Sequence, residues 1–279
     1  MFLKIQYFNI KEVSEKYPWV KWFQKDGNWY YRDKEGPLVK GLQSINGYKY
    51  YFNEDGVMQT GLQTIKRQVY YFNENGTMVT DWKDVDNKWY YFNENGIKVP
   101  NVFLDVPESH WGYDQISYMA GNKIINGYGN GYFGANDNLT REQLAAVLYK
   151  SLSLPDTSDN SFTDINDSPF KKEILSLTKS GIFSVNGEKT FNPKNTATRA
   201  EIAVVLTKAF NLKIKANYEF NDMKDHWANE YVKALYSNGI ASGTGNKNFN
   251  SGANVSRAEM AVFLYRAINL NPNFVPKPI

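Results

Sequence analysis

Three arginines occupy the same place in three similar segments of the 279-residue chain. Each follows a Thr or Ser, opens an apolar run with helical spacing, and lies 35 or 36 positions after an Asp. The pairs are Asp105–Arg141, Asp164–Arg199 and Asp222–Arg257. A cation in the first turn does not help the helix itself, but a guanidinium beside the N–H groups of a helix start can bind an anion. The spacing therefore predicts anion binding, with two alternatives open: internal ion pairs for the arginines and helix capping for the aspartates.

The elements that must position these residues are helices. Thr140, Thr198 and Ser256 suit an N-cap, and a Gln or Glu three residues later completes each capping box. The apolar stripes that follow are Leu144, Val147 and Leu148; Ile202, Val205 and Leu206; and Met260, Phe263 and Leu264. A shorter helix precedes each one, and a Gly-rich loop separates the two helices of each unit. Each unit begins at a Phe expected in the core, namely Phe103, Phe162 and Phe220.

These three units resemble the S-layer homology (SLH) domain, which usually occurs in three consecutive copies. The resemblance implies an all-α, pseudo-threefold assembly whose Thr-Arg helices gather at the centre. It also implies grooves that bind a secondary cell-wall polymer through N-acetylmannosamine bearing a pyruvate ketal, whose carboxylate suits Arg. The groove residues implied are Asp105, Trp111, Gly127 and Arg141; Asp164 and Arg199; and Asp222, Trp227, Gly243 and Arg257. Phe170 stands where the second unit should have Trp, and Val185 where it should have Gly, so we expect fewer than three working grooves.

A different repeat precedes these units, with a period of twenty. Tyr and Gly recur in it at fixed positions, the Tyr set being Tyr31, Tyr51, Tyr71 and Tyr91. Each repeat reads as an aromatic strand, a polar turn and a short second strand, and Asn75-Gly76 is a strong tight-turn signal. Because one hairpin alone is marginal in water, neighbouring hairpins must stack. The period predicts a β-solenoid over residues 20–100.

The segment 41–53 of this array resembles the cell-wall-binding repeats of choline-binding proteins, glucan-binding proteins and clostridial toxin tails. The resemblance implies ligands held on aromatic ring faces. The candidates are Trp22, Trp29, Tyr50, Tyr70, Trp82 and Trp89. Lys49 and Val69 stand where the two middle repeats should carry an aromatic of a choline cage, so a glycan is favoured over choline. The alternative is that these aromatics only pack the solenoid.

Composition excludes several classes of protein. The chain has no Cys, which removes disulfides and zinc–thiolate sites, and its net charge of +3 is too small to indicate nucleic-acid binding. No apolar stretch approaches the roughly 18 residues of a membrane span. His110 and His226 stand apart from any carboxylate cluster, so we expect neither a metal site nor a catalytic triad, and no cofactor. Residues 1–8 lack the pattern of a signal peptide, so we expect that an exported protein would be present here as a mature form, a fragment or a chain with a misassigned start.

The sequence thus predicts a multidomain protein: an N-terminal segment (1–19), a β-hairpin solenoid (20–100), three SLH domains (101–158, 159–216 and 217–271) and a tail (272–279). The function we expect is non-catalytic anchoring at the cell surface, with the solenoid binding a second glycan or wall component. Two alternatives remain. The solenoid would recognise host glycans or choline, as an adhesin or toxin-like receptor binder does, or it would serve only as a spacer.

Overall fold

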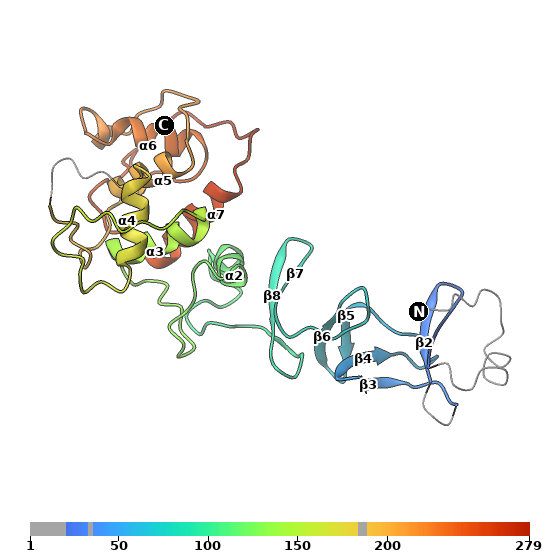
Figure 1. Cartoon of the computed structure of the whole chain (residues 1–279). Helices are drawn as coiled ribbons and strands as arrows, with labels where there is room; N and C mark the ends of the chain where they lie inside the picture. The colour runs from blue at the N-terminus through green and yellow to red at the C-terminus, as the bar shows by residue number, and fades with distance from the viewer. Residues whose placement is uncertain (1–20, 33–35, 184–188) are drawn as a thin grey trace. The chain divides into compact units, whose positions relative to one another are not determined.

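The computed structural model describes residues 21–32, 36–183 and 189–279. The chain divides into two compact units, residues 1–100 and 101–279 (Figure 1). The first unit is built of β-hairpins and the second of helices, so each is described by itself.

The β unit consists of antiparallel hairpins that share one register. Leu42 pairs with Tyr51, Leu62 with Tyr71, and so on at the same position of each repeat. The hairpins are β1 (Trp22–Lys25) with β2 (Asn28–Tyr31), β3 (Gly41–Ile45) with β4 (Tyr48–Phe52), β5 (Gly61–Ile65) with β6 (Gln68–Phe72), and β7 (Asp81–Val85) with β8 (Lys88–Phe92) and β9 (Lys98–Val99). The aromatic strand is thus the second strand of each hairpin.

Two tight turns define each repeat. The Asn75-Gly76 turn is confirmed, since Gly76 has a φ of 81° and its N–H donates to Asn73 O at 2.8 Å. The hairpin itself closes through a two-residue turn that the sequence reading missed. In the third repeat this turn is Lys66-Arg67, both with positive φ, and the second central residue is Gly only in the first two repeats, as in Asn46-Gly47.

Backbone and side-chain contacts join successive hairpins. The N–H of Met58 donates to Trp29 O, and that of Met78 to Lys49 O, each at 2.8 Å. Phe52, Phe72 and Phe92 are fully buried, and Tyr51 packs against Phe72 of the next repeat at 6.1 Å between ring centroids. Each hairpin therefore buries its aromatic side chains against the next hairpin, which is the stacking that the twenty-residue period predicts.

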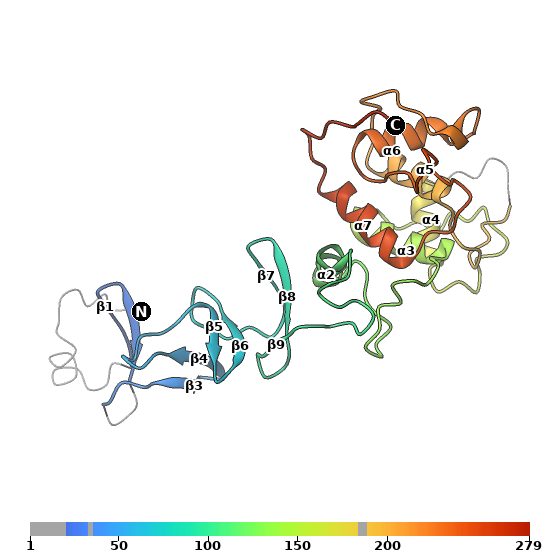
Figure 2. The same ribbon diagram turned by 180° about the vertical axis from the view of Figure 1, so that it is seen from behind.

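The helical unit contains two helices per repeat. They are α2 (Tyr113–Gly121) and α3 (Arg141–Leu152), α4 (Lys171–Lys179) and α5 (Arg199–Ala209), and α6 (Asn229–Ser237) and α7 (Arg257–Ile268), with a 3₁₀ turn η1 (Asn221–Met223). The second helix of each repeat packs against the first helix of the next: α3 on α4, and α5 on α6. The last helix, α7, packs on α2 of the first repeat, so the helix contacts between repeats form a closed cycle (Figure 2).

Local sequence explains where the long helices begin. The Thr140, Thr198 and Ser256 hydroxyls accept the N–H of Gln143, Glu201 and Glu259, and each capping box is complete, as predicted. The apolar stripes of α3, α5 and α7 are buried in a single core that includes residues of all three repeats. The helix starts are therefore fixed locally, while their faces are fixed by the neighbouring repeats.

Short backbone bridges also join the repeats just before these helices. The Arg141 N–H donates to Asn195 O, the Arg199 N–H to Ala253 O, and the Arg257 N–H to Asp137 O, all at 2.9 Å. The N–H of the next residue in each helix also donates to the neighbouring repeat. The prediction that free N–H groups of the helix starts help to bind an anion is therefore wrong, because another repeat already uses them.

Candidate functional site

Each of the three arginines crosses into the loop of another repeat. Arg141 donates from Nε to Phe191 O at 2.8 Å, Arg199 to Phe249 O at 2.9 Å, and Arg257 to Phe133 O at 3.0 Å. The guanidinium also lies over the ring of the same Phe, at 4.8, 4.5 and 5.0 Å from the centroid. The prediction that each arginine lies beside the Asp of its own repeat is therefore wrong. Arg141 contacts the loop held by Asp164, Arg199 the loop held by Asp222, and Arg257 the loop held by Asp105.

The three aspartates hold these loops in shape. Asp105 accepts the N–H groups of Phe133, Gly134 and Ala135, each at 2.8 Å. Asp164 accepts those of residues 191 and 192, and Asp222 those of residues 249 and 250, at 2.7 or 2.8 Å. These bonds span 27 to 30 positions, so the alternative that each Asp caps the helix following it is wrong. Each Asp instead positions the carbonyl that receives an arginine.

Burial and hydrogen bonding oppose each other at Asp105. Burial raises the pKa of this carboxyl, but the bonds from the backbone N–H groups of Ala135, Phe133 and Gly134 outweigh burial and hold the pKa below its ordinary value. The carboxylate is therefore ionised whenever the loop is folded near neutral pH.

The arginines differ in their exposure. The Arg199 side chain is 5% exposed and Arg257 as a residue is 6% exposed, whereas the Arg141 side chain is 24% exposed. Burial lowers the pKa of both Arg199 and Arg257, and nearby acidic groups act in the opposite direction. The internal ion pairs left open by the sequence are present at two arginines, because Arg141 contacts Glu201 and Arg199 lies 3.6 Å from Glu259.

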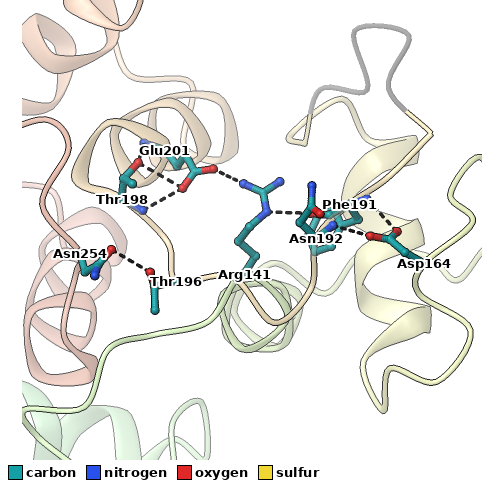
Figure 3. A network of polar contacts seen from close by, with 8 residues as sticks. All are labelled: Arg141, Asp164, Phe191, Asn192, Thr196, Thr198, Glu201 and Asn254. Atoms are coloured by element: carbon teal, nitrogen blue, oxygen red, sulfur yellow. Dashed lines mark hydrogen bonds and ion pairs between the residues drawn. The ribbon is translucent and has the colours of Figure 1, made fainter.

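A cavity of about 390 Å³ lies beside Arg141, between the first and second repeats. Figure 3 shows the Arg141 side chain reaching between Glu201 on α5 and the Phe191 loop held by Asp164. The cavity is lined by Arg141, Phe162, Thr190, Phe191, Asn192, Asn195, Thr196, Thr198 and Glu201. Hydroxyl, amide and guanidinium groups around an aromatic floor are suited to the hydroxyls and the apolar face of a sugar.

The two predicted tryptophans are exposed. Trp111 and Trp227 precede the N-caps of α2 and α6. Each ring packs on the preceding His, stacked at 5.3 Å between centroids for Trp111 and tilted at 5.4 Å for Trp227. His110 and His226 each accept a backbone N–H at the helix entry, so both help to fix the start of the helix. Exposed indole rings of this kind can cover a sugar face.

The second repeat departs from this arrangement by one position. Ser168 accepts the N–H of Phe170, as His110 and His226 accept the N–H two residues later in their repeats. Phe170 is the N-cap of α4, so Pro169 occupies the place of the tryptophans. The interpretation that Phe170 replaces Trp is therefore wrong by one residue, although the second repeat does lack the indole.

The loop glycines are required by packing. A Cβ on Gly127 would lie 2.5 Å from the Phe103 ring and 2.7 Å from Tyr132 O, and Gly243 is placed in the same way against Phe220 and Asn248 O. The resemblance implied that these glycines belong to the grooves, whereas the atoms nearest to the added Cβ belong to the same repeat. Val185, which replaces the Gly in the second repeat, lies outside the described residues.

Three of the aromatic candidates in the β unit come together. Trp22 contacts Trp29 of its own hairpin and Tyr50 of the next, at 6.5 and 5.0 Å between centroids. Tyr70 is buried and stacks on Phe72, so it serves packing. Trp82 is part-buried and packs on Tyr91. Trp89, the last candidate, is part-buried on β8.

Two ring faces further along the array carry lysines of the same chain. Lys83 Nζ lies 5.2 Å from the centroid of Tyr71, and Lys98 Nζ lies 4.5 Å from that of Tyr90. An ammonium group on a ring face is the interaction that a choline cage would offer to its ligand. These faces are therefore occupied from within the chain.

Comparison with known families agrees with both repeat types. The S-layer homology domain matches residues 102–145, 161–203 and 219–261, the choline-binding repeat matches 39–61 and 59–103, and a cell wall binding repeat matches 20–38. The chain therefore carries three SLH domains preceded by choline-binding repeats.

Several relatives match more than half of the chain. S-layer protein EA1 of Bacillus anthracis is 35% identical over 168 residues, 58% of this chain and 19% of that protein. The S-layer protein of Bacillus licheniformis is 34% identical over the same length, and a cellulosome-anchoring protein of Acetivibrio thermocellus is 28% identical over 161 residues, 53% of this chain and 36% of that protein. The chain spans about a fifth of the S-layer relatives. Among solved structures, choline binding protein F of Streptococcus pneumoniae is 37% identical over 29% of this chain and 28% of its own, with a TM-score of 0.28.

Neither a metal centre nor a membrane segment is found in the described part of the chain. No three His, Cys, Asp or Glu side chains gather there as metal ligands would. Likewise, none of its helices combines the length and the apolar character that a bilayer crossing needs.

Proposed function

We propose that this chain is a non-catalytic anchoring protein of a bacterial cell surface, whose SLH domains bind a secondary cell-wall polymer. The observation that carries the proposal is the insertion of each arginine into the loop of another repeat, with Arg141 bordering an open polar cavity. The polymer favoured by the family resemblance is one ending in pyruvylated N-acetylmannosamine. S-layer and anchoring proteins among the relatives support the same class of function.

The proposal includes the architecture that joins the grooves. Three SLH domains, at 101–158, 159–216 and 217–271, would form one pseudo-threefold ring, which the cyclic order of helix contacts supports. The three inter-repeat backbone bonds at the helix starts follow the same order. In residues 20–100, the bonds from each methionine to the preceding repeat support a β-solenoid.

The proposal is tested by binding of the full chain to isolated cell walls before and after removal of the pyruvylated polymer. Arg141→Gln should weaken binding to intact walls by roughly ten- to a hundredfold, because a charge-assisted hydrogen bond contributes about 1.5–3 kcal/mol. Lys172→Gln is the matched control, since it removes one cation from an exposed ion pair with Asp156. Equal binding to intact and stripped walls would contradict the proposal.

A second binding function is supported by the cluster of Trp22, Trp29 and Tyr50 in the β unit. We infer that these rings bind a wall component through their faces, either a glycan or a quaternary ammonium such as choline. Trp22→Ala should abolish most of that binding in titrations of the full chain with choline and with wall glycans. Wild-type titrations without a response would instead favour the spacer role.

A further inference from the structure

Several Asn-Gly pairs lie in the part of the chain that the structure describes, and this dipeptide can modify itself. The backbone nitrogen of the Gly can attack the side-chain amide of the Asn, because Gly has no Cβ to hinder the approach. This nitrogen must lose its proton to react, so a Gly N–H that already donates a hydrogen bond reacts slowly. The described pairs are Asn46-Gly47, Asn75-Gly76, Asn95-Gly96, Asn126-Gly127, Asn130-Gly131 and Asn238-Gly239.

Two of these pairs, Asn75-Gly76 and Asn95-Gly96, are protected by the turn that contains them. In both, the Gly N–H donates to the backbone carbonyl of the residue three positions earlier, at 2.8 Å. The Asn75 side chain is also engaged, because its Oδ1 accepts the N–H and the hydroxyl of Thr77. Attack on either Asn therefore requires the turn to open first.

Contacts restrain the pairs of the helical unit as well. The Gly239 N–H donates to Tyr236 O at 2.9 Å, and Asn238 is buried. Arg257 Nη2 donates to Asn126 O at 2.9 Å, and Asn130 Oδ1 accepts the Tyr132 N–H at 3.1 Å. Each of these bonds must break before the Asn can rotate towards the nitrogen that follows it.

The Asn46-Gly47 pair is the exposed tip of a hairpin. Both residues are exposed and form the centre of the turn between β3 and β4, whose ladder pairs only the flanking Ile45 and Tyr48. Within the described ranges the Gly47 N–H donates to no backbone carbonyl, and a Cβ on Gly47 would meet no atom within 4 Å. The nitrogen is therefore accessible to a base, and the Asn46 side chain has room to turn towards it.

We propose that Asn46 is a site of spontaneous deamidation, the least protected of the described Asn-Gly pairs. The Gly47 nitrogen gives its proton to a base and bonds to Asn46 Cγ, while the Cγ–Nδ2 bond breaks and Nδ2 takes up a proton and leaves as ammonia. Water then adds to one of the two carbonyls of the cyclic imide and opens the ring. The product is aspartate or isoaspartate at position 46. Each adds a negative charge, and isoaspartate also adds a methylene group to the main chain.

The two products have different effects on the hairpin. Aspartate fits the turn, because the first repeat carries Asp26-Gly27 at the same place, with φ angles of 49° and 80°. Isoaspartate does not fit, because a two-residue turn fixes the register of its strands and leaves no room for an extra main-chain atom. The pairing of Ile45 with Tyr48 is then lost, and β4 shifts against β3.

The strand that shifts carries part of the aromatic cluster. Tyr48 is exposed, and Tyr50 lies on the same face of β4 and contacts Trp22 at 5.0 Å between ring centroids. Burial raises the pKa of Tyr50, and the Tyr48 hydroxyl raises it further, so the two phenols interact. Isoaspartate at position 46 therefore displaces rings of the cluster. The resulting loss of binding rests on the proposed function of that cluster, whereas the modification itself does not.

The site is tested by peptide mass spectrometry of the full chain during incubation in mildly alkaline buffer. Asn46 should deamidate several times faster than Asn75 and Asn95, which lie in the same array and serve as internal controls. Asn46→Gly removes the reacting amide and keeps a turn that Gly tolerates. The aged wild type should lose thermal stability of the β unit, and binding of choline or wall glycans, in proportion to its isoaspartate content. Aged Asn46→Gly and fresh Asn46→Asp should keep both.

The outcomes against the inference are distinguishable from failure of the proposed function. Equal rates of deamidation at positions 46, 75 and 95 would overturn the site, whatever the chain binds. If fresh wild type binds neither choline nor wall glycans, the binding function of the cluster fails, and mass spectrometry and the unfolding midpoint still decide the modification and its effect on the hairpin. An aged chain rich in isoaspartate at position 46 that keeps the midpoint and the binding of fresh protein would overturn the structural consequence.

Discussion

The loop aspartates can be tested without any ligand, through the stability of the helical unit. Asp105→Asn replaces a carboxylate that accepts three N–H groups by an amide with one carbonyl oxygen. Bonds to a charged acceptor contribute about 1.5–3 kcal/mol each. In the amide one of the three bonds must be lost, and the two that Oδ2 accepts lose their charged acceptor. Because the carboxylate is part-exposed and water replaces some of the lost bonding, we expect a loss of about 3 kcal/mol in the free energy of unfolding.

Urea unfolding followed by the helical circular dichroism signal measures this loss. Asp222→Asn is the matched comparison, because Asp222 accepts two N–H groups in the same way and should lose about 2 kcal/mol. Asp167→Asn, at an exposed position, should change the free energy of unfolding little. An Asp105→Asn loss below that of Asp222→Asn, or within error of Asp167→Asn, would refute the reasoning.

The same carboxylate predicts a dependence on pH with a definite sign. The pKa of Asp105 is lowered in the folded state, so its contribution is complete above the ordinary value of 3.8 and is lost as pH falls through the lower folded pKa. The stability difference between the wild type and Asp105→Asn should therefore be constant near neutral pH and shrink below pH 3.8. A difference that persists unchanged in strong acid would show that the charge is not its source.

Two glycine substitutions test the packing of each unit. Gly243→Ala should lower the free energy of unfolding by about 1–3 kcal/mol, because its Cβ would lie 2.6 Å from the Phe220 ring and 2.7 Å from a backbone carbonyl. Gly252→Ala is the control and should leave the free energy of unfolding unchanged, because a Cβ at Gly252 meets open space. Equal unfolding midpoints for the two variants would contradict this prediction. Gly76→Ala should destabilise the β unit more than Gly47→Ala, measured by thermal unfolding monitored at the aromatic signal. Both have φ near 80°, but only Gly76 would place its Cβ on Met58, 2.2 Å from Sδ.

The parts of the fold that follow from local rules could be predicted from the sequence. The Thr-Arg and Ser-Arg helix starts are confirmed because a capping box needs only four consecutive residues. The apolar stripes are confirmed because helical periodicity alone fixes which face is buried. The Asn-Gly turns of the β repeats are confirmed for the same local reason.

The missed features depend on contacts between repeats or on turns without a glycine signal. The Lys66-Arg67 turn has both residues at positive φ, although neither residue type favours it, because the hairpin register imposes that conformation. The partner of Asp105 lies 28 to 30 positions away, at a loop that no local pattern links to it. Phe170 was taken for the tryptophan position because the first repeat has one more residue between its Asp and its Trp than the third repeat has. The second repeat follows the shorter spacing of the third, which places Pro169 there.

The exchange of residues between repeats predicts that the three SLH copies depend on one another. Each groove takes its arginine from one repeat and its loop from another, and the third groove joins Arg257 of the last repeat to the Asp105 loop of the first. Removal of the first repeat would therefore remove the Arg141 side chain from one groove and the loop from a different one. Only the groove of Arg199 would stay complete, so one missing repeat costs two grooves.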